Sequence, residues 1–142
     1  LAGLSNQGNF WEKEIKPYLK KDIQYIGNIP YEKIYKYYGQ AKALLCPIQW
    51  EEPFGLTFIE AMACGTPVIA FDRGSVREVI KDGKTGFIVK NLKEMVQAIK
   101  KIDQIDRKEC RRWVEANFTV EKMVDGYERL FLKILRDRTL KD

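Results

Sequence analysis

The stretch from residue 51 to residue 71 reads EEPFGLTFIEAMACGTPVIAF and contains three structural signals in order. It opens with a loop containing a proline and a glycine, and the eight residues after Gly55 are all compatible with a helix. Gly65 can adopt the left-handed conformation that ends a helix, and the Thr-Pro pair after it keeps the backbone extended. The pattern therefore predicts a helix over 56–63 and a short buried strand over 68–71.

The start of this helix is a candidate site for an anion. The first N–H groups of a helix have no acceptor within it, and Gly55 has no side chain to keep a ligand from the amides of Gly55, Leu56 and Thr57. The positive end of the helix dipole attracts phosphate. The alternative is an ordinary helix start that binds nothing.

Two carboxylates flank this helix start. Glu52 precedes it, and Glu60 lies about 7.5 Å beyond Gly55 along the helix axis. The predicted inward face carries Leu56, Ile59 and Ala63. Glu60 lies on that face, where it is either solvated at the margin or turned toward a polar group that the fold supplies. A ligand with a central diphosphate and a sugar on each side, such as a nucleotide-sugar, would place one sugar near each carboxylate.

Three motifs occur in order, namely EPFGLTFIEAMACGTPVIA, a GxxxE over 74–78 and a DGxxGF over 82–87. The first resembles the donor-binding signature of family 4 glycosyltransferases, in which two glutamates separated by seven residues, here Glu52 and Glu60, flank FGL. The similarity runs from about residue 1 to 131. It implies an α/β fold with a Rossmann-like doubly wound parallel sheet, the C-terminal half of a GT-B glycosyltransferase.

The resemblance assigns roles to eight residues. Glu52 is expected to contact donor-sugar hydroxyls and to be the catalytic residue of this segment, and Glu60 is expected to accept hydrogen bonds from ribose hydroxyls. The implied donor-binding set is Glu52, Phe54, Gly55, Leu56, Thr57, Glu60, Arg73 and Gly74. From its local pattern alone, the loop at 73–74 is either a second anion site or a tight turn with Arg73 on the surface.

The implied reaction moves a hexose from a nucleoside-diphosphate sugar to an acceptor hydroxyl, with retention at the anomeric carbon, in glycan or glycolipid synthesis. The helix amides would share the growing charge on the diphosphate leaving group. The family places its acceptor site in an N-terminal domain and a basic Arg/Lys pair before the point where this chain starts, so the isolated chain is expected to be inactive. No cofactor is expected, and no metal, because two carboxylates beside phosphate-binding amides do not require one.

Composition sets the domain number and excludes several classes of site. With 142 residues, 45% of them hydrophobic, the chain can bury one core, so a single domain is expected over 1–142, truncated at its N-terminus. It has no histidine, which excludes histidine-based catalysis and the usual zinc sites within these residues. Its three cysteines lack a CxxC spacing and are predicted to be reduced, as in a cytoplasmic protein.

The net charge of +5 arises from 25 basic and 20 acidic residues that are interleaved along the chain. No stripe of basic residues alternates with aromatic ones, so nucleic acid is not an expected partner. No apolar run reaches the roughly 18 to 20 residues needed to span a bilayer. Peripheral attraction to the inner face of an anionic membrane is a further expectation.

Strands and helices are predicted to alternate along the rest of the chain. Leu1 to Gly3 is expected to be the end of a strand, and further strands are expected at 24–26, 43–46 and 87–89. Pro17 should interrupt the first helix near Lys16. Further helices are expected at 30–41, 76–81, 91–102 and 106–113, and from Thr119 onward.

Aromatic residues near the predicted site have two interpretations each. Tyr35, Tyr37 and Tyr38 form either a platform for sugar stacking or, as we favour, part of the core and its rim. Trp50 either lines a pocket or, as we favour, packs against Phe54.

The last predicted helix, 119–138, carries an apolar stripe of more than three turns. It packs either on the sheet of this domain or, as the resemblance implies, partly on the N-terminal GT-B domain. For the whole chain, the competing hypothesis is a stand-alone, non-catalytic module that binds a sugar nucleotide or a partner. A dehydrogenase-like domain is disfavoured because the G-x-G-x-x-G turn is absent from the sequence.

Overall fold

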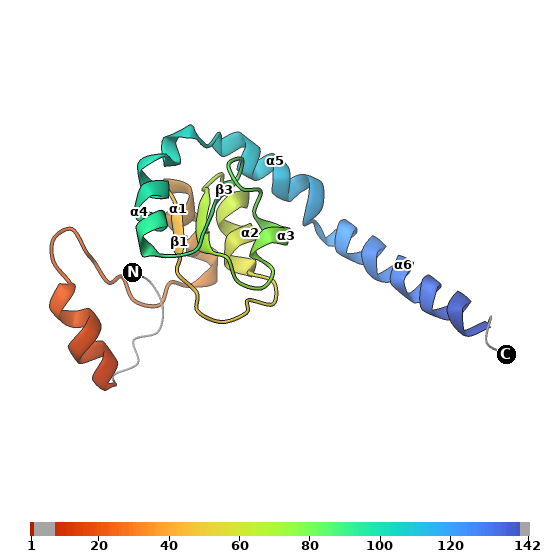
Figure 1. Ribbon diagram of the computed structural model, residues 1–142, viewed down its shortest axis with the longest axis horizontal. Coiled ribbons are helices and arrows are strands. Elements are labelled where there is room, and N and C mark those ends of the chain that lie inside the picture. Colours follow the sequence, from red (N-terminus) through yellow and green to blue (C-terminus); the bar gives the residue numbers. More distant parts are fainter. Residues whose placement is uncertain (2–7, 140–142) are drawn as a thin grey trace. The chain divides into compact units, whose positions relative to one another are not determined.

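The computed structural model describes residue 1 and residues 8–139, and it separates into two compact units, Leu1–Tyr37 and Tyr38–Asp142 (Figure 1). The second unit contains the sheet and all eight residues of the predicted site. Within the described residues, no helix combines the length and the apolar character needed to cross a bilayer.

The first unit begins with two short helical segments, the π-helical turn η1 (Trp11–Ile15) and the 3-10 turn η2 (Lys16–Tyr18). The helix type changes at Lys16, as predicted, because Pro17 has no N–H to continue the helix. Helix α1 (Tyr31–Gln40) begins directly after Pro30, also as predicted.

The strand predicted at 24–26 is not formed. Within the described residues, Leu1 is joined to this segment by a 2.7 Å bond from the Leu1 ammonium to the Gln24 carbonyl and by a 2.9 Å bond from the Ile26 amide to the Leu1 carbonyl. Ala2 and Gly3, the rest of the strand predicted there, lie outside the described residues.

The second unit is built on three parallel strands, β1 (Leu44–Cys46), β2 (Val68–Phe71) and β3 (Gly86–Val89), in the order β1-β2-β3. The strands predicted at 43–46, 68–71 and 87–89 are therefore confirmed to within a residue. The central strand is fully buried from Val68 to Ala70. Gly86 pairs with Val68 so closely that a Cβ on Gly86 would lie 1.9 Å from the Val68 carbonyl oxygen.

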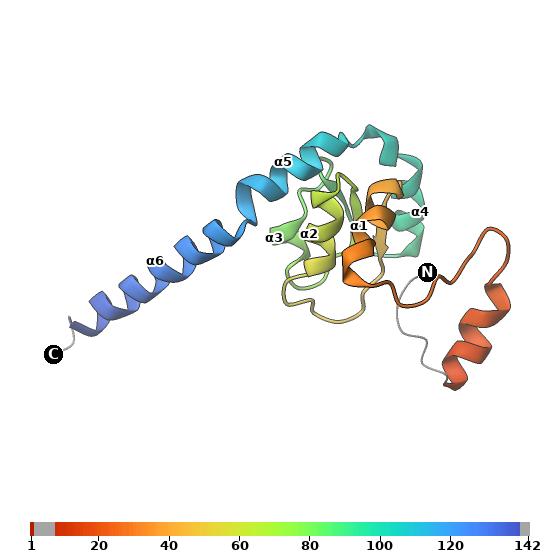
Figure 2. The same ribbon diagram turned by 180° about the vertical axis from the view of Figure 1, so that it is seen from behind.

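Helices cover both sides of this sheet. In Figure 1 and Figure 2 the strands lie between α4 (Leu92–Lys100) on one side and α2 (Leu56–Ala63) and α3 (Val76–Val79) on the other. Helix α4 packs on β2 and β3, while α2 packs on β2 and on α5 (Arg107–Asn117). This is the α/β, doubly wound arrangement predicted from the sequence. Helix α3 stops two residues before the predicted Lys81, whose amide donates to the Thr85 hydroxyl instead.

The predicted inward face of α2 is wrong, although its bounds and the left-handed Gly65 (φ +76°) are confirmed. Leu56 is 66% exposed, and neither of the other two predicted core positions is fully buried. The buried face consists of Phe58, Ala61 and Met62. The helix is apolar over most of its circumference, so its contacts with β2 and α5, rather than its periodicity, determine which residues point inward.

Side chains cap the later helices. Asn91 Oδ1 accepts from the Glu94 amide at 2.9 Å, and the Glu94 carboxylate accepts from the Lys90 amide at 2.8 Å, which forms a capping box at α4. A short 3-10 turn, η3 (Ile102–Gln104), leads to Asp106, which caps α5 through the Lys108 amide.

Helix α6 (Val120–Thr139) does not bury its apolar stripe on the sheet. Every residue from 120 to 137 is exposed, and Phe131 retains 59% of its accessible surface. Of the two arrangements considered for this helix, packing on the sheet of its own domain is therefore wrong.

Candidate functional site

Five of the eight predicted site residues line one hollow of about 510 Å³ at the carboxyl end of β1, where α2 begins. They are Glu52, Phe54, Gly55, Leu56 and Thr57. The carboxyl ends of parallel strands are where ligands bind in open α/β sheets.

This hollow, of about 510 Å³, also has Cys46, Ile48 and Trp50 in its wall. The loop 48–54 therefore delivers the predicted residues to the place where the topology expects a ligand.

Gly55 sets the geometry of this helix start. It has φ +80°, and a Cβ built on it would lie 2.3 Å from the ring of Phe58. Its carbonyl accepts the first bond of the helix from the Phe58 amide at 2.9 Å. Both the left-handed turn and the close approach of the Phe58 ring require glycine here.

The Glu52 carboxylate binds directly at this helix start. Its Oε1 accepts from the Gly55 amide at 3.0 Å, and its Oε2 accepts from Trp50 Nε1 at 3.1 Å. The Gly55 amide predicted to bind phosphate is therefore taken by the chain's own carboxylate, because an anion just before a helix satisfies its first N–H groups. For the amides of Leu56 and Thr57, the described part of the chain supplies no acceptor.

Trp50 and Phe54, the two aromatic residues of this loop, do not pack on each other as we favoured from the sequence. Trp50 is 62% exposed and lines the hollow, with its indole N–H directed to Glu52. Phe54 forms an edge-to-face contact with Phe118, with a centroid distance of 6.1 Å. Trp50 thus belongs to the wall of the hollow, and the favoured packing of Trp50 on Phe54 is wrong.

The remaining loop residues, Arg73 and Gly74, contact the carboxylate of Glu51, which is not among the predicted site residues. The Gly74 amide donates to the carboxylate of Glu51, and the Arg73 guanidinium lies 3.6 Å from the same group. The Ser75 amide donates to the Glu52 carbonyl at 2.8 Å. The second anion site considered for this loop therefore holds Glu51, and the loop at 73–75 fixes the backbone at 51–52.

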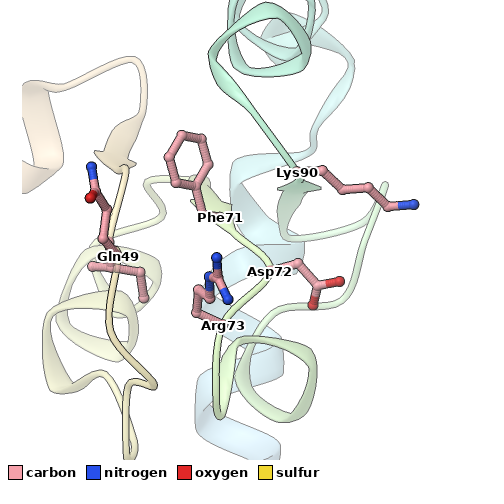
Figure 3. A pocket seen from close by; sticks show the side chains of 6 residues that line it. Gln49, Phe71, Asp72, Arg73 and Lys90 are labelled. Carbon is pink, nitrogen blue, oxygen red and sulfur yellow. The ribbon is translucent and has the colours of Figure 1, made fainter.

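A second hollow, of about 450 Å³, adjoins the first, since Ile48 lines both. Figure 3 shows the Arg73 guanidinium pointing into the space between Gln49 and Asp72, whereas the Lys90 ammonium points away from it. The Asp72 carboxylate is paired with Arg77 at 2.5 Å. Arg73 is therefore the cation that faces this second hollow.

Glu60 lines neither of these hollows and is half-buried. Its Oε2 accepts a hydrogen bond from the Tyr38 hydroxyl at 3.3 Å. Burial, with the negative charge of Glu60 and this bond, raises the pKa of Tyr38 to about 12, so its hydroxyl keeps its proton at neutral pH. Of the two environments considered for Glu60, the structure shows the one with a polar partner.

The three cysteines are unpaired, as predicted. Burial, with the nearby charge of Glu52, raises the pKa of Cys46 to about 12, and burial raises that of Cys110 to about 11. The pKa of Cys64 is raised as well, chiefly by burial. Thiols with such pKa values are poor nucleophiles at neutral pH, so none has the character of a catalytic cysteine. Across residue 1 and residues 8–139, no three His, Cys, Asp or Glu side chains are grouped to bind a metal ion.

Residues 1–120 match the sequence model of a protein family described as glycosyl transferases group 1. The chain belongs to this family. This group 1 glycosyltransferase chain is 32% identical over 102 residues to N-acetyl-alpha-D-glucosaminyl L-malate synthase of Bacillus anthracis, covering 66% of the chain and 27% of that relative. It is 29% identical over 123 residues to spore coat protein SA of Bacillus subtilis, covering 78% of the chain and 33% of that relative.

Among solved structures, this group 1 glycosyltransferase chain is similar to sucrose-phosphate synthase from Thermosynechococcus elongatus. The TM-score is 0.78 with 28% identity, over 96% of this chain and 38% of that one. The GT-B, Rossmann-like α/β fold predicted from the sequence is confirmed. The group 1 chain spans about a third of the length of the curated relatives it matches, 33% of spore coat protein SA and 27% of the malate synthase.

Proposed function

We propose that this chain is the donor-binding, C-terminal domain of a retaining family 4 glycosyltransferase. The complete enzyme would transfer a hexose from a nucleoside-diphosphate sugar to an acceptor hydroxyl in glycan or glycolipid synthesis. The observation that carries the proposal is the start of α2, where the Leu56 and Thr57 amides and the Glu52 carboxylate meet at one hollow.

The Leu56 and Thr57 amides provide donors for the diphosphate at the positive end of α2. As the glycosidic bond breaks, charge grows on the diphosphate, and fixed donors stabilise that charge without reorganising. Glu52 lies beside them and opposes part of the positive potential. Binding a diphosphate there therefore requires added cations. Arg73, which lines the adjoining hollow and lies 3.6 Å from the Glu51 carboxylate, is the basic residue of the proposed set.

Glu52 is proposed to receive the donor sugar. A carboxylate offers about four acceptor positions, of which two are used by the Gly55 amide and Trp50 Nε1. The remaining positions can accept sugar hydroxyls, and the two existing bonds orient the group for this task. Glu60, in the next turn of α2, is proposed to accept from the ribose hydroxyls.

The rest of the enzyme would come from an N-terminal GT-B domain, which holds the acceptor. The exposed stripe of α6 is proposed to lie partly on that domain, since it covers nothing in the sheet of its own unit. We therefore expect the 142-residue chain to bind donor but not to transfer sugar. Its unpaired thiols support a cytoplasmic location, with peripheral contact at the inner membrane face as part of the proposal. No metal is assigned a role.

Binding to the 142-residue chain tests these roles, with NMR titration detecting affinities down to the millimolar range. The ligands are UDP, GDP, ADP and their glucose conjugates. Glu60→Ala should weaken binding of both the nucleotide and the nucleotide-sugar about tenfold, the effect of losing hydrogen bonds to a charged group. Glu52→Gln and Glu52→Ala should weaken binding of the nucleotide-sugar but spare the free nucleotide.

Asp103→Asn is the matched control, because Asp103 is an exposed carboxylate outside both hollows. It should leave all affinities unchanged. If the Glu52 variants and Glu60→Ala each lost as much affinity for the free nucleotide as for the nucleotide-sugar, the division of roles between Glu52 and Glu60 would be rejected. Absence of binding by every nucleotide would reject the donor site itself.

A further inference from the structure

Tyr38, in the last turn of α1, contacts a carboxylate 22 residues further along the chain. It is only 9% exposed, and its hydroxyl donates to Glu60 Oε2 at 3.3 Å. The neighbouring Tyr37 is 47% exposed. The two tyrosines therefore differ sharply in environment, and only Tyr38 directs its hydroxyl at a residue of the proposed site.

The backbone around Tyr38 is fixed independently of Glu60. The buried Thr66 hydroxyl donates to the Tyr38 carbonyl. Arg107 donates to the Gly39 carbonyl at 2.9 Å, to the Ala41 carbonyl at 2.7 Å and to the Thr66 hydroxyl at 3.0 Å. These bonds set the end of α1, which carries Tyr38, against α5 and the start of β2.

A single donor of this kind has two effects on Glu60. The bond from Tyr38 restricts the Glu60 side chain before a ligand binds. Ordering an unrestricted side chain of this kind costs up to about 2 kcal/mol of rotamer entropy. The bond also uses only Oε2, and within the described residues no donor is recorded for Oε1. Because the raised pKa keeps the Tyr38 hydroxyl protonated, it remains a donor at every physiological pH.

We propose that Tyr38 is a positioning residue that orients Glu60 for the ribose hydroxyls of the nucleotide. This inference rests on the proposed function, since it assumes that Glu60 receives the ribose. Tyr38 thus contributes to the preference for ribose from outside α2, without contacting the ligand itself.

The test compares ribose with 2′-deoxyribose nucleotides. Affinities of UDP, GDP and ADP and of their 2′-deoxy counterparts are measured on the 142-residue chain and on Tyr38→Phe, Glu60→Ala and Tyr37→Phe. The wild type should prefer ribose, and Glu60→Ala, which leaves no acceptor for the ribose hydroxyls, should abolish that preference. Tyr38→Phe should reduce the preference about threefold to tenfold, as expected for one lost hydrogen bond. Tyr37→Phe, the matched removal of an exposed hydroxyl, should keep it.

The outcomes separate the two proposals. If Glu60→Ala loses the ribose preference while Tyr38→Phe keeps it, the role of Tyr38 is wrong and the proposed function stands. If Glu60→Ala keeps the preference, or the wild type has none, the assignment of Glu60 to ribose fails and the role of Tyr38 fails with it.

A second measurement keeps Tyr38 in the protein, so its result does not depend on whether Tyr38→Phe folds. The Tyr38 hydroxyl is titrated by NMR of the ring carbon in the wild type and in Glu60→Gln. Loss of the carboxylate charge should lower the Tyr38 pKa from about 12. An unchanged value would show that the two groups do not interact in solution, which would overturn the inference.

Discussion

The peptide group of Glu52 lies directly over Gly74, so closely that a Cβ on Gly74 would be 2.3 Å from the Glu52 carbonyl oxygen and 2.5 Å from its nitrogen. Gly74 also has φ +54°, a conformation that other residues adopt at a cost. The loop that follows β2 thus provides the surface on which the loop after β1 rests, and the Ser75 amide bonds the two together.

Gly74→Ala should therefore displace the backbone at Glu52 and destabilise the domain. The backbone conformation alone costs about 1–2 kcal/mol for a residue with a Cβ, and the clash adds to it. Gly83→Ala is the matched control, since Gly83 has φ +71° but no atom within 4 Å of its Cβ position. Urea unfolding should show a clearly larger loss for Gly74→Ala. Equal losses in the two variants would mean that the contact with Glu52 does not matter.

Glu51→Gln should leave stability nearly unchanged, while Glu51→Ala should disturb the Gly74 loop. The ion pair with Arg73 spans 3.6 Å and is exposed at both ends, so it contributes about 0–1 kcal/mol. Glutamine retains an oxygen for the Gly74 amide, whereas alanine does not. The Gly74 amide resonance reports the difference, with Asp103→Ala as the control. Matching shifts of that resonance in both Glu51 variants would contradict this account.

Glu52→Gln should lower the pKa of Cys46, because the negative charge of Glu52 disfavours the thiolate. The thiolate is the reactive form, so alkylation of Cys46 by iodoacetamide between pH 8 and 10 should be faster in the variant. Peptide mass spectrometry follows each thiol separately. Cys110 is the internal control, since burial is the main cause of its raised pKa and Glu52 is not among the causes. Equal acceleration at both thiols would indicate local unfolding instead.

Arg107→Ala should destabilise the domain by about 1.5–3 kcal/mol, the cost of removing a charged donor from its acceptors. Arg107 bonds the carbonyls of Gly39 and Ala41 at the end of α1, where a cation is also favoured by the helix dipole. Arg111→Ala is the control, because the ion pair of Arg111 within the described residues is an exposed one with Glu115, worth about 1 kcal/mol at most. Similar unfolding midpoints for the two variants would show that Arg107 does not anchor α1.

The sequence was sufficient for the local features of the fold. The Gly-Thr-Pro that ends α2 and the break at Lys16 each depend on a few adjacent residues, and both are found. The inward face of α2 was not predictable in this way. Most of its positions are apolar, and the choice among them depends on α5, which lies about 50 residues further along the sequence.

The candidate site was predicted in its composition but not in its contacts. The motif indicated Glu52 and Glu60, and the carboxyl end of β1 indicated where the loop would lie. That Glu51 would accept from the Gly74 amide depends on two loops that are over 20 residues apart in sequence. The bond from the Gly55 amide to Glu52 is local, since the two residues are three positions apart, but the motif does not show which way the carboxylate turns. Tyr38 was predicted as core or rim, and no periodicity could show that its hydroxyl meets Glu60.

The contact between Gly86 and the Val68 carbonyl limits how this domain can be engineered. A saturation-mutagenesis library that includes residue 86 should return only glycine among folded clones, because any side chain there would separate two neighbouring strands. Randomisation of the hollows is better spent on Gln49 and Trp50, which line them without supporting the sheet.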